Sequence, residues 1–193
     1  GYIPNSQVYD KVYGKSRWKS LNIVSLSIGQ GEVTATPIQI ANLAATIANK
    51  GYWYTPHFLK SIEGVDTTII FEKHNVLIEK QYFDPIIKGM EMAVNATDGG
   101  TARIARIDSI VVCGKTGTAQ NPHGEDHSVF MAFAPKENPR IAIAVLVENA
   151  GFGATWAAPI ASLMMEKYLK GEIASERKWL ENRVSETVIL PKR

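Results

Sequence analysis

The chain has 193 residues, of which 45% are hydrophobic, a length and composition that suit one folded domain with its own core. Its 21 basic and 19 acidic residues are mixed along the chain and give a formal net charge of +2, a pattern that argues against nucleic acid as a partner. A single cysteine, Cys113, excludes an intramolecular disulfide and a cysteine-rich zinc site.

The sequence predicts no leader or membrane-spanning segment within these residues. No stretch approaches the roughly 18 to 20 consecutive apolar residues of a membrane helix, and the start at Gly1 lacks the charged and apolar regions of a signal peptide. We therefore expect the chain to be part of a longer protein whose targeting segment lies elsewhere.

The first third is expected to hold a strand and a helix. Residues 1–22 have no sustained period and predict irregular structure with at most a short helix. The β-prone run from Ile23 to Ile28 predicts a strand that ends at Gly29-Gln30-Gly31. Thr36 followed by Pro37 is typical of a helix start, and that helix should end near residues 49–51.

The middle of the chain predicts short strands and then a second helix. Residues 52–80 alternate aromatic and β-branched residues with turn formers, which indicates short strands such as Thr67 to Phe71. The next helix should run from Asp84-Pro85 to Ala96, and Asp98-Gly99-Gly100-Thr101 should close it.

The second half predicts an antiparallel sheet. A strand from Ile110 to Cys113 should lead into Gly114-Lys115-Thr116-Gly117-Thr118. Val129 to Ala134 and Ile141 to Val147 should form a hairpin joined by Pro135 to Arg140. Three consecutive strands without intervening helices favour an α+β fold with an antiparallel sheet flanked by helices.

The C-terminal region predicts one long helix and a tail. The helix should run from Thr155 or Ala157 to Leu169, with Gly171 as its C-cap. Residues 171–193 are charged and are expected to be a peripheral tail, so that the domain proper covers residues 1–170.

The most informative segment runs from Val111 to Gln120. In it a buried-looking strand ends in Lys115-Thr116-Gly117-Thr118, which combines a cation, two hydroxyls and a glycine. Such an edge can meet a peptide substrate, and Lys-Thr-Gly is one of three motifs of the penicillin-binding protein and serine β-lactamase group. The tripeptide alone is a weak signal, and the plain alternative is a strand end with a solvated lysine.

Other segments occur around the motif in the order of one family. They are Ser27-Ile28-Gly29-Gln30-Gly31, Ala35-Thr36-Pro37-Ile38-Gln39-Ile40-Ala41, Gly99-Gly100-Thr101-Ala102, Phe133-Ala134-Pro135 and Val147-Glu148-Asn149. Together they resemble class B penicillin-binding proteins, and among these the elongation-type transpeptidases of the penicillin-binding protein 2 group. The resemblance covers roughly residues 1–170. Gly-Gln-Gly favours the elongation type over the septal type, which is the nearest alternative.

The resemblance implies a β-lactamase/transpeptidase-like fold and a serine-type D,D-transpeptidase that cross-links stem peptides of peptidoglycan. It implies no cofactor or metal, β-lactams as inhibitors, and wall-elongation proteins as partners. The full-length protein would be anchored in the inner membrane with this domain on the periplasmic side. A serine β-lactamase or D,D-carboxypeptidase and a non-catalytic β-lactam sensor stay as alternatives.

The resemblance also implies a role for each residue of the motif. Acyl transfer to D-Ala-D-Ala needs a cation for the terminal carboxylate, hydroxyls to orient it and an N–H for the oxyanion. Lys115 would supply the positive charge, Thr116 and Thr118 would bind carboxylate, and Gly117 would allow close approach. The N–H of Thr118 would be half of the oxyanion hole, and the N–H of the nucleophile would be the other half.

We expect the nucleophilic serine to lie outside this chain, which alone would then be inactive. Ser16-Arg17-Trp18-Lys19 and Ser20-Leu21-Asn22 match the other two motifs literally. However, Ser16 is not followed by an amphipathic helix, and Lys19 and Ser20 are only about 3.8 Å apart at their Cα atoms. Adjacent residues cannot form opposite walls of a cleft.

Three further features have simpler readings. His123 and His127 have metal-ligand spacing, but Pro122 and Gly124 favour a polar loop over a helical zinc site. Cys113 is expected in the core. Residues 151–156 could either shape a substrate groove or pack on the sheet.

Overall fold

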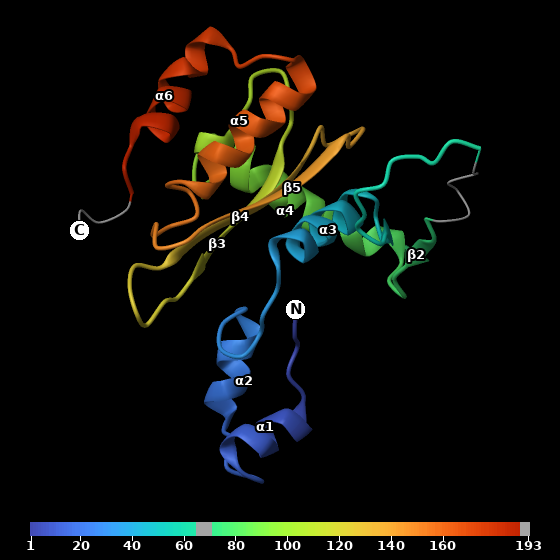
Figure 1. Ribbon diagram of the computed structural model, residues 1–193, viewed down its shortest axis with the longest axis vertical. Coiled ribbons are helices and arrows are strands. Elements are labelled where there is room, and N and C mark those ends of the chain that lie inside the picture. Colours follow the sequence, from blue (N-terminus) through green and yellow to red (C-terminus); the bar gives the residue numbers. More distant parts are fainter. Residues whose placement is uncertain (65–70, 190–193) are drawn as a thin grey trace.

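A computed structural model describes residues 1–64 and 71–189 (Figure 1). Its centre is an antiparallel sheet with the strand order β3-β4-β5. The strands are β3 (Cys113–Ala119), β4 (His127–Ala134) and β5 (Ile141–Val147). The expected antiparallel sheet and its hairpin are therefore confirmed.

The first strand of this sheet begins later than expected. Ile110 pairs back onto Ile107 in an isolated bridge, across a tight turn in which Ser109 has a φ of 60°. Because this turn uses the residues before Val112, the strand starts at Cys113 and contains Lys115-Thr116-Gly117 within it. The strand predicted from Ile110 thus begins three residues later, at Cys113, and it leads into the motif as expected.

Helices cover both faces of the sheet. On one face, Phe130, Ala132 and Ala134 are fully buried in a cluster that includes residues of α5 (Ala157–Lys170). On the other face, Cys113 and Phe133 pack in a cluster with residues of α3 (Pro37–Ala48) and α4 (Phe83–Asn95). Figure 1 shows α5 and α6 (Lys178–Glu186) on one side of the sheet and α3 on the other.

The three long helices occur where the sequence predicts them. They are α3 (Pro37–Ala48), α4 (Phe83–Asn95) and α5. The backbone N–H of Thr36 donates to Gln39 Oε1 at 2.9 Å in a capping box at the start of α3. Gly171 ends α5 with a φ of 86°, a left-handed conformation that favours glycine.

The strand expected from Ile23 to Ile28 is instead the helix α2 (Ser20–Ser27). The side chain of Asn22 accepts from the N–H of Lys19 at 2.9 Å and so caps the helix. No described strand lies beside this segment, so a helix is the conformation that satisfies its backbone groups locally. Its β-branched side chains stay exposed, with 44% of Ile23 and 57% of Val24 accessible.

An aromatic cluster joins α1 (Ser6–Tyr13), the short helix anticipated near the start, to the segment after α2. Tyr9 donates to Glu32 Oε2 at 2.8 Å, and Tyr13 also donates to Glu32. Burial and the hydrogen bond to Glu32 raise the pKa of Tyr9 to about 12. The hydrogen bond from Tyr13, and after it the one from Tyr9, lowers the pKa of Glu32. Figure 1 shows α1 and α2 together as a projection from the sheet-containing body.

A small second sheet pairs β1 (Tyr52–Tyr54) with β2 (Lys73–Asn75), as expected for short strands in this region. The expected strand from Thr67 to Phe71 lies outside the described residues except for Phe71. The 3-10 turns are η2 (Lys80–Tyr82), η3 (Arg103–Ala105) and η4 (Ser175–Arg177). None of the described helices is long and apolar enough to cross a membrane.

The charged segment after α5 is better anchored than a peripheral tail. It forms η4 and α6 (Lys178–Glu186), and Leu180 is only 1% exposed. Arg177 donates to Glu166 Oε2 and to Ser162 Oγ, both at 2.6 Å, and these two partners on α5 are fully buried. A buried carboxylate thus ties the segment to α5. The proposed domain division at residue 170 stays a prediction.

We predict that Arg177→Ala lowers the free energy of unfolding by about 3 kcal/mol or more. Among the described residues, the buried carboxylate of Glu166 would then keep only Lys170, 3.6 Å away, as a cationic neighbour. Denaturant unfolding followed by circular dichroism measures the change. Lys178→Ala is the matched control, since its ion pair with Glu181 is exposed and should contribute less than about 1 kcal/mol. Equal effects of the two variants would contradict the prediction.

A second prediction concerns Cys113, which is fully buried in β3 as expected for a core residue. Burial raises the pKa of its thiol from 9.0 to about 12. An aromatic disulfide reagent at pH 8 should therefore leave the folded protein unmodified and titrate one thiol after denaturation in guanidinium. Rapid modification of the folded protein would refute the burial.

The same shift predicts a pH dependence of stability. The folded state favours the protonated thiol, so the contribution of Cys113 is fully present below pH 9 and is lost as pH rises toward 12. The free energy of unfolding should fall more steeply over this window in the wild-type chain than in Cys113→Ala. Parallel pH profiles would show that the thiol makes no such contribution.

Candidate active site

The Lys-Thr-Gly motif lies in the edge strand of the main sheet. Among the described strands, β3 pairs with β4 alone, with Lys115 opposite Met131 and Gly117 opposite Val129. The other edge of β3 therefore presents backbone groups that a further extended chain could pair with. Strand alternation places Lys115 and Gly117 on one face, and Thr116 and Thr118 on the opposite face.

The hydrogen bonds show which residues point their backbone groups away from β4. The carbonyl of Thr118 accepts from Gln30 Nε2 at 2.9 Å, and the carbonyl of Thr116 accepts from Lys115 Nζ at 2.5 Å. The N–H and C=O of one strand residue point to the same side. The N–H groups of Thr116 and Thr118 therefore also face the open edge, and the ammonium of Lys115 reaches this edge from its own face of the sheet.

The hydroxyl of a threonine outside the motif, Thr101, lies next to it. Thr116 Oγ1 lies 3.4 Å from Thr101 Oγ1, although the two residues are 15 positions apart in the sequence. Thr101 follows α4 in the Gly99-Gly100-Thr101-Ala102 segment, to which sequence reasoning assigned no role. Its place in a family-like segment was the only signal for it, since no spacing rule connects it to β3.

A cavity of about 470 Å³ lies along the lysine face of β3. Its walls come from β3 to β5, from the segment after α2 and from the start of α3. The residues that line it include Gln30, Pro37, Ile40, Lys115, Thr118, Val129 and Leu146. The sequence-predicted residues Lys115, Thr116, Gly117 and Thr118 all contribute to this cavity.

Residues 151–156 pack on the sheet behind the motif. A Cβ atom at Gly153 would lie only 2.5 Å from the backbone oxygen of Gly117, and closer still to that of Val129. The hydroxyl of the fully buried Ser128 donates to the Phe152 carbonyl at 2.9 Å and accepts from the Ala157 N–H at 3.1 Å. This segment therefore supports β3 from the threonine face.

Neither literal serine motif has the local structure of a nucleophile site. Ser16 lies in a turn before α2 with a φ of 61°, and its N–H donates to Asp10. Lys19 is the N-cap of α2, while Ser20 begins it and Asn22 caps it. These residues form a turn and the start of a helix.

The two histidines have structural contacts. His127 lies in β4, and its Nδ1 accepts from the backbone N–H of Asn149 at 3.0 Å. The N–H of His123 donates to Asn121 in the preceding loop. Within residues 1–64 and 71–189, no group of three or more His, Cys, Asp and Glu side chains could hold a metal ion.

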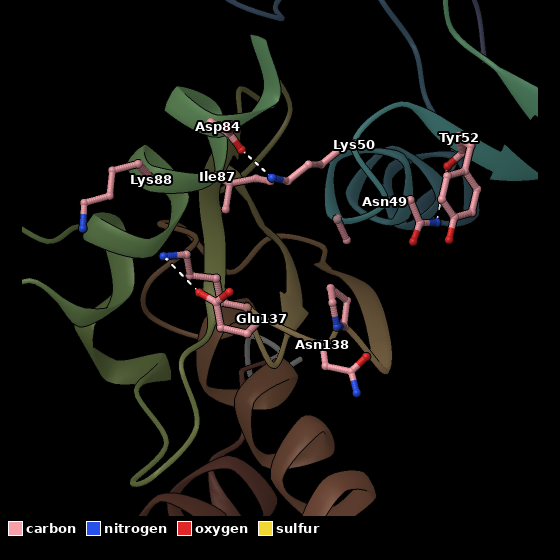
Figure 2. Close-up of a pocket in the computed structure, with 11 residues that line it drawn as sticks. Asn49, Lys50, Tyr52, Asp84, Ile87, Lys88, Glu137 and Asn138 are labelled. Atoms are coloured by element: carbon pink, nitrogen blue, oxygen red, sulfur yellow. Dashed lines mark hydrogen bonds and ion pairs between the residues drawn. The ribbon is translucent and has the colours of Figure 1, made fainter. Parts of the chain in front are cut away.

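A larger cavity of about 670 Å³ lies between the end of α3, α4 and the turn after β4 (Figure 2). Figure 2 shows Lys50 directed at Asp84, with which it pairs at 2.6 Å. Lys136 pairs with Glu91 at 3.2 Å and with Glu137 at 3.5 Å. Because carboxylates neutralise these lysines, the cavity is a poor candidate for an anion site, and the motif strand does not line it.

Comparisons with known proteins agree with this geometry. The model of the penicillin-binding protein transpeptidase domain matches residues 4–166. The peptidoglycan D,D-transpeptidase MrdA of Haemophilus influenzae is 34% identical over 200 residues, which cover 92% of this chain and 30% of the relative. PbpA of Mycobacterium tuberculosis, also called a peptidoglycan D,D-transpeptidase, is 35% identical over 76% of this chain and 32% of its own length.

Solved structures give the same result. Pseudomonas aeruginosa PBP2 in complex with WCK 5153 superposes with a TM-score of 0.75 and 35% identity, covering 90% of this chain and 38% of that one. PBP2 from Helicobacter pylori gives 0.73 at 27% identity, covering 90% and 31%. The chain thus spans about a third of the length of these relatives. The expected α+β transpeptidase-like fold is confirmed, and the chain belongs to the penicillin-binding protein transpeptidase family.

Proposed function

We propose that the protein containing this chain is a peptidoglycan D,D-transpeptidase of the elongation type. The observation that carries the proposal is the open edge of β3, where Lys115 and the N–H groups of Thr116 and Thr118 face one side. An extended stem peptide can pair with such an edge, and its terminal carboxylate needs the cation and hydroxyls that lie there. The likeness to proteins named D,D-transpeptidases supports the same reaction.

In this reaction a serine hydroxyl attacks the carbonyl of the penultimate D-Ala of a stem peptide. The serine ester forms, the peptide bond breaks, and the terminal D-Ala leaves after its nitrogen takes up a proton. An amine of a second stem peptide then attacks the ester, which forms the cross-link and returns the serine hydroxyl. In each half-reaction the carbonyl oxygen gains negative charge that hydrogen-bond donors must stabilise.

We assign five residues of this chain to that chemistry. The N–H of Thr118 donates to the developing oxyanion. The hydroxyls of Thr116 and Thr118 bind the terminal carboxylate, and Thr101, 3.4 Å from Thr116, orients the first of them. Lys115 supplies positive charge at the open edge of β3. Gly117, on the same face of the strand as Lys115, leaves that face free of a second side chain.

The serine itself is supplied by residues outside this chain, in our proposal. Ser16 lies in a turn and is not the first residue of a helix, and the relatives are about three times as long as the matched region. We further propose that the domain works on the periplasmic side of the inner membrane with other wall-elongation proteins. A solved complex between PBP2 and MreC from Helicobacter pylori supports such a partnership, since the matching chain of that complex is 27% identical to this one.

Intact-mass analysis after incubation with benzylpenicillin tests this proposal. The full-length protein should gain one penicilloyl adduct on a serine outside these 193 residues, and the 193-residue chain alone should gain none. Peptide mapping locates the ester. A stoichiometric adduct on Ser16 of the isolated chain would overturn the assignment, and an unmodified full-length protein would overturn the proposed function.

A second prediction concerns Lys115. In the full-length protein, Lys115→Ala should lower the second-order rate constant of acylation by about a hundredfold or more, because a charge that stabilises the transition state is removed. A fluorescent penicillin measures this rate. Lys80→Ala, an exposed lysine of η2, is the control and should react at the wild-type rate. A Lys115 variant as fast as this control would remove the residue from the mechanism.

A further inference from the structure

Two side-chain amides limit the open edge of β3. At its start, Asn95 Nδ2, at the end of α4, donates to the carbonyl of Val112 at 2.7 Å. At its end, Gln30 Nε2 donates to the carbonyl of Thr118 at 2.9 Å, and Gln30 Oε1 lies 3.5 Å from the N–H of Gln120. Val112 and Thr118 are six residues apart, so the edge between these carbonyls is about 20 Å long.

The amide of Gln30 takes the place that a peptide group of a neighbouring strand would occupy. A primary amide offers one carbonyl acceptor and an NH₂ donor, and Gln30 directs one of each at β3. The bond to Thr118 is well formed, whereas the contact with Gln120 is at the weak limit of a hydrogen bond. A chain paired with this edge cannot continue past Thr118 while Gln30 holds its place.

The local backbone fixes where the amide lies. Gln30 stands between two glycines with φ values of 75° and 72°, a left-handed conformation that other residues adopt only at a cost. Its backbone N–H donates to the Ser25 carbonyl at 3.0 Å, which anchors it to α2. The Gly29-Gln30-Gly31 segment thus connects α2 to the end of the motif strand, 88 residues later in the chain.

We propose that Gln30 is a positioning residue for the acyl transfer proposed above, on which this inference rests. By holding the Thr118 carbonyl, it fixes the peptide plane that follows Thr118. Through the backbone dihedral angles of Thr118 it also restrains the preceding plane, which carries the Thr118 N–H. By occupying the edge beyond Thr118, it also sets the point at which a bound peptide chain ends. Gln30 thus acts through Thr118 and not through contact with the reacting atoms.

Gln30→Met in the full-length protein tests the inference, because methionine keeps the length of the side chain and loses both polar contacts. The limiting acylation rate constant for benzylpenicillin should fall roughly tenfold, the effect of about one lost hydrogen bond. The penicillin concentration that gives half this rate should change less than about threefold, because the groups that bind the carboxylate are unchanged. Stopped-flow measurements separate the two quantities.

Gln39→Met is the matched control. Gln39 is also an amide on this part of the chain, but it bonds to Thr36 at the start of α3. Its loss should lower the melting temperature slightly and leave the limiting acylation rate constant unchanged. Gln30→Glu provides a second test with a polar side chain of the same length, because its carboxylate would face the Thr118 carbonyl, and it should slow acylation at least as much as Gln30→Met.

The outcomes distinguish the inference from the proposed function. If wild-type protein is not acylated, the proposed function is wrong. If wild-type protein is acylated and either Gln30 variant reacts at its rate, the positioning role is wrong. A fall in the rate constant that Gln39→Met reproduces would likewise overturn the role, since it would reflect only general loosening of the fold.

Discussion

The unpaired edge of β3 is the constraint on which the rest of this structure depends. An edge strand exposes a row of N–H and C=O groups, which proteins normally cover or protect. Here side chains satisfy the carbonyls of Val112, Thr116 and Thr118, while the N–H groups of Thr116 and Thr118 face the open side. These three carbonyls are thus satisfied within the described chain, and the two threonine donors stay available to a bound partner.

The packing behind the strand keeps this edge in place. On the threonine face, Gly153 lies directly on the backbone at Gly117, and Ser128 holds the neighbouring loop with two hydrogen bonds. A Cβ at Gly114 would collide with the ring of Phe130, so the strand fits against its core only with a glycine there. Helices on both faces hold the sheet, and the edge has little freedom to shift.

The segment before α3 has two structural tasks. Its aromatic cluster around Glu32 holds α1 against the turn after α2. That turn places Gln30 in hydrogen-bond contact with β3. Meanwhile α2 leaves apolar side chains such as Leu21 and Val24 exposed, 74% and 57% respectively. A cluster of polar contacts, rather than a large core, thus determines where this part of the chain lies.

The sequence by itself determined the main elements and the motif strand of this protein. Thr36-Pro37, the two β-prone runs of the hairpin and Gly171 are local signals, and the helices and strands follow them because capping, alternation and left-handed glycine act over a few residues. The Lys-Thr-Gly motif in its family-like context likewise indicated the family. These features need no knowledge of distant contacts.

Only the tertiary structure decided the rest. Ile23 to Ile28 became helical because none of the described strands lies beside it, and the turn at Ser109 moved the start of β3 to Cys113. The contacts of Thr101 with Thr116 and of Gln30 with Thr118 join residues 15 and 88 positions apart. No local rule predicts such pairs, because they exist only after the chain has folded and brought separate elements to one strand edge.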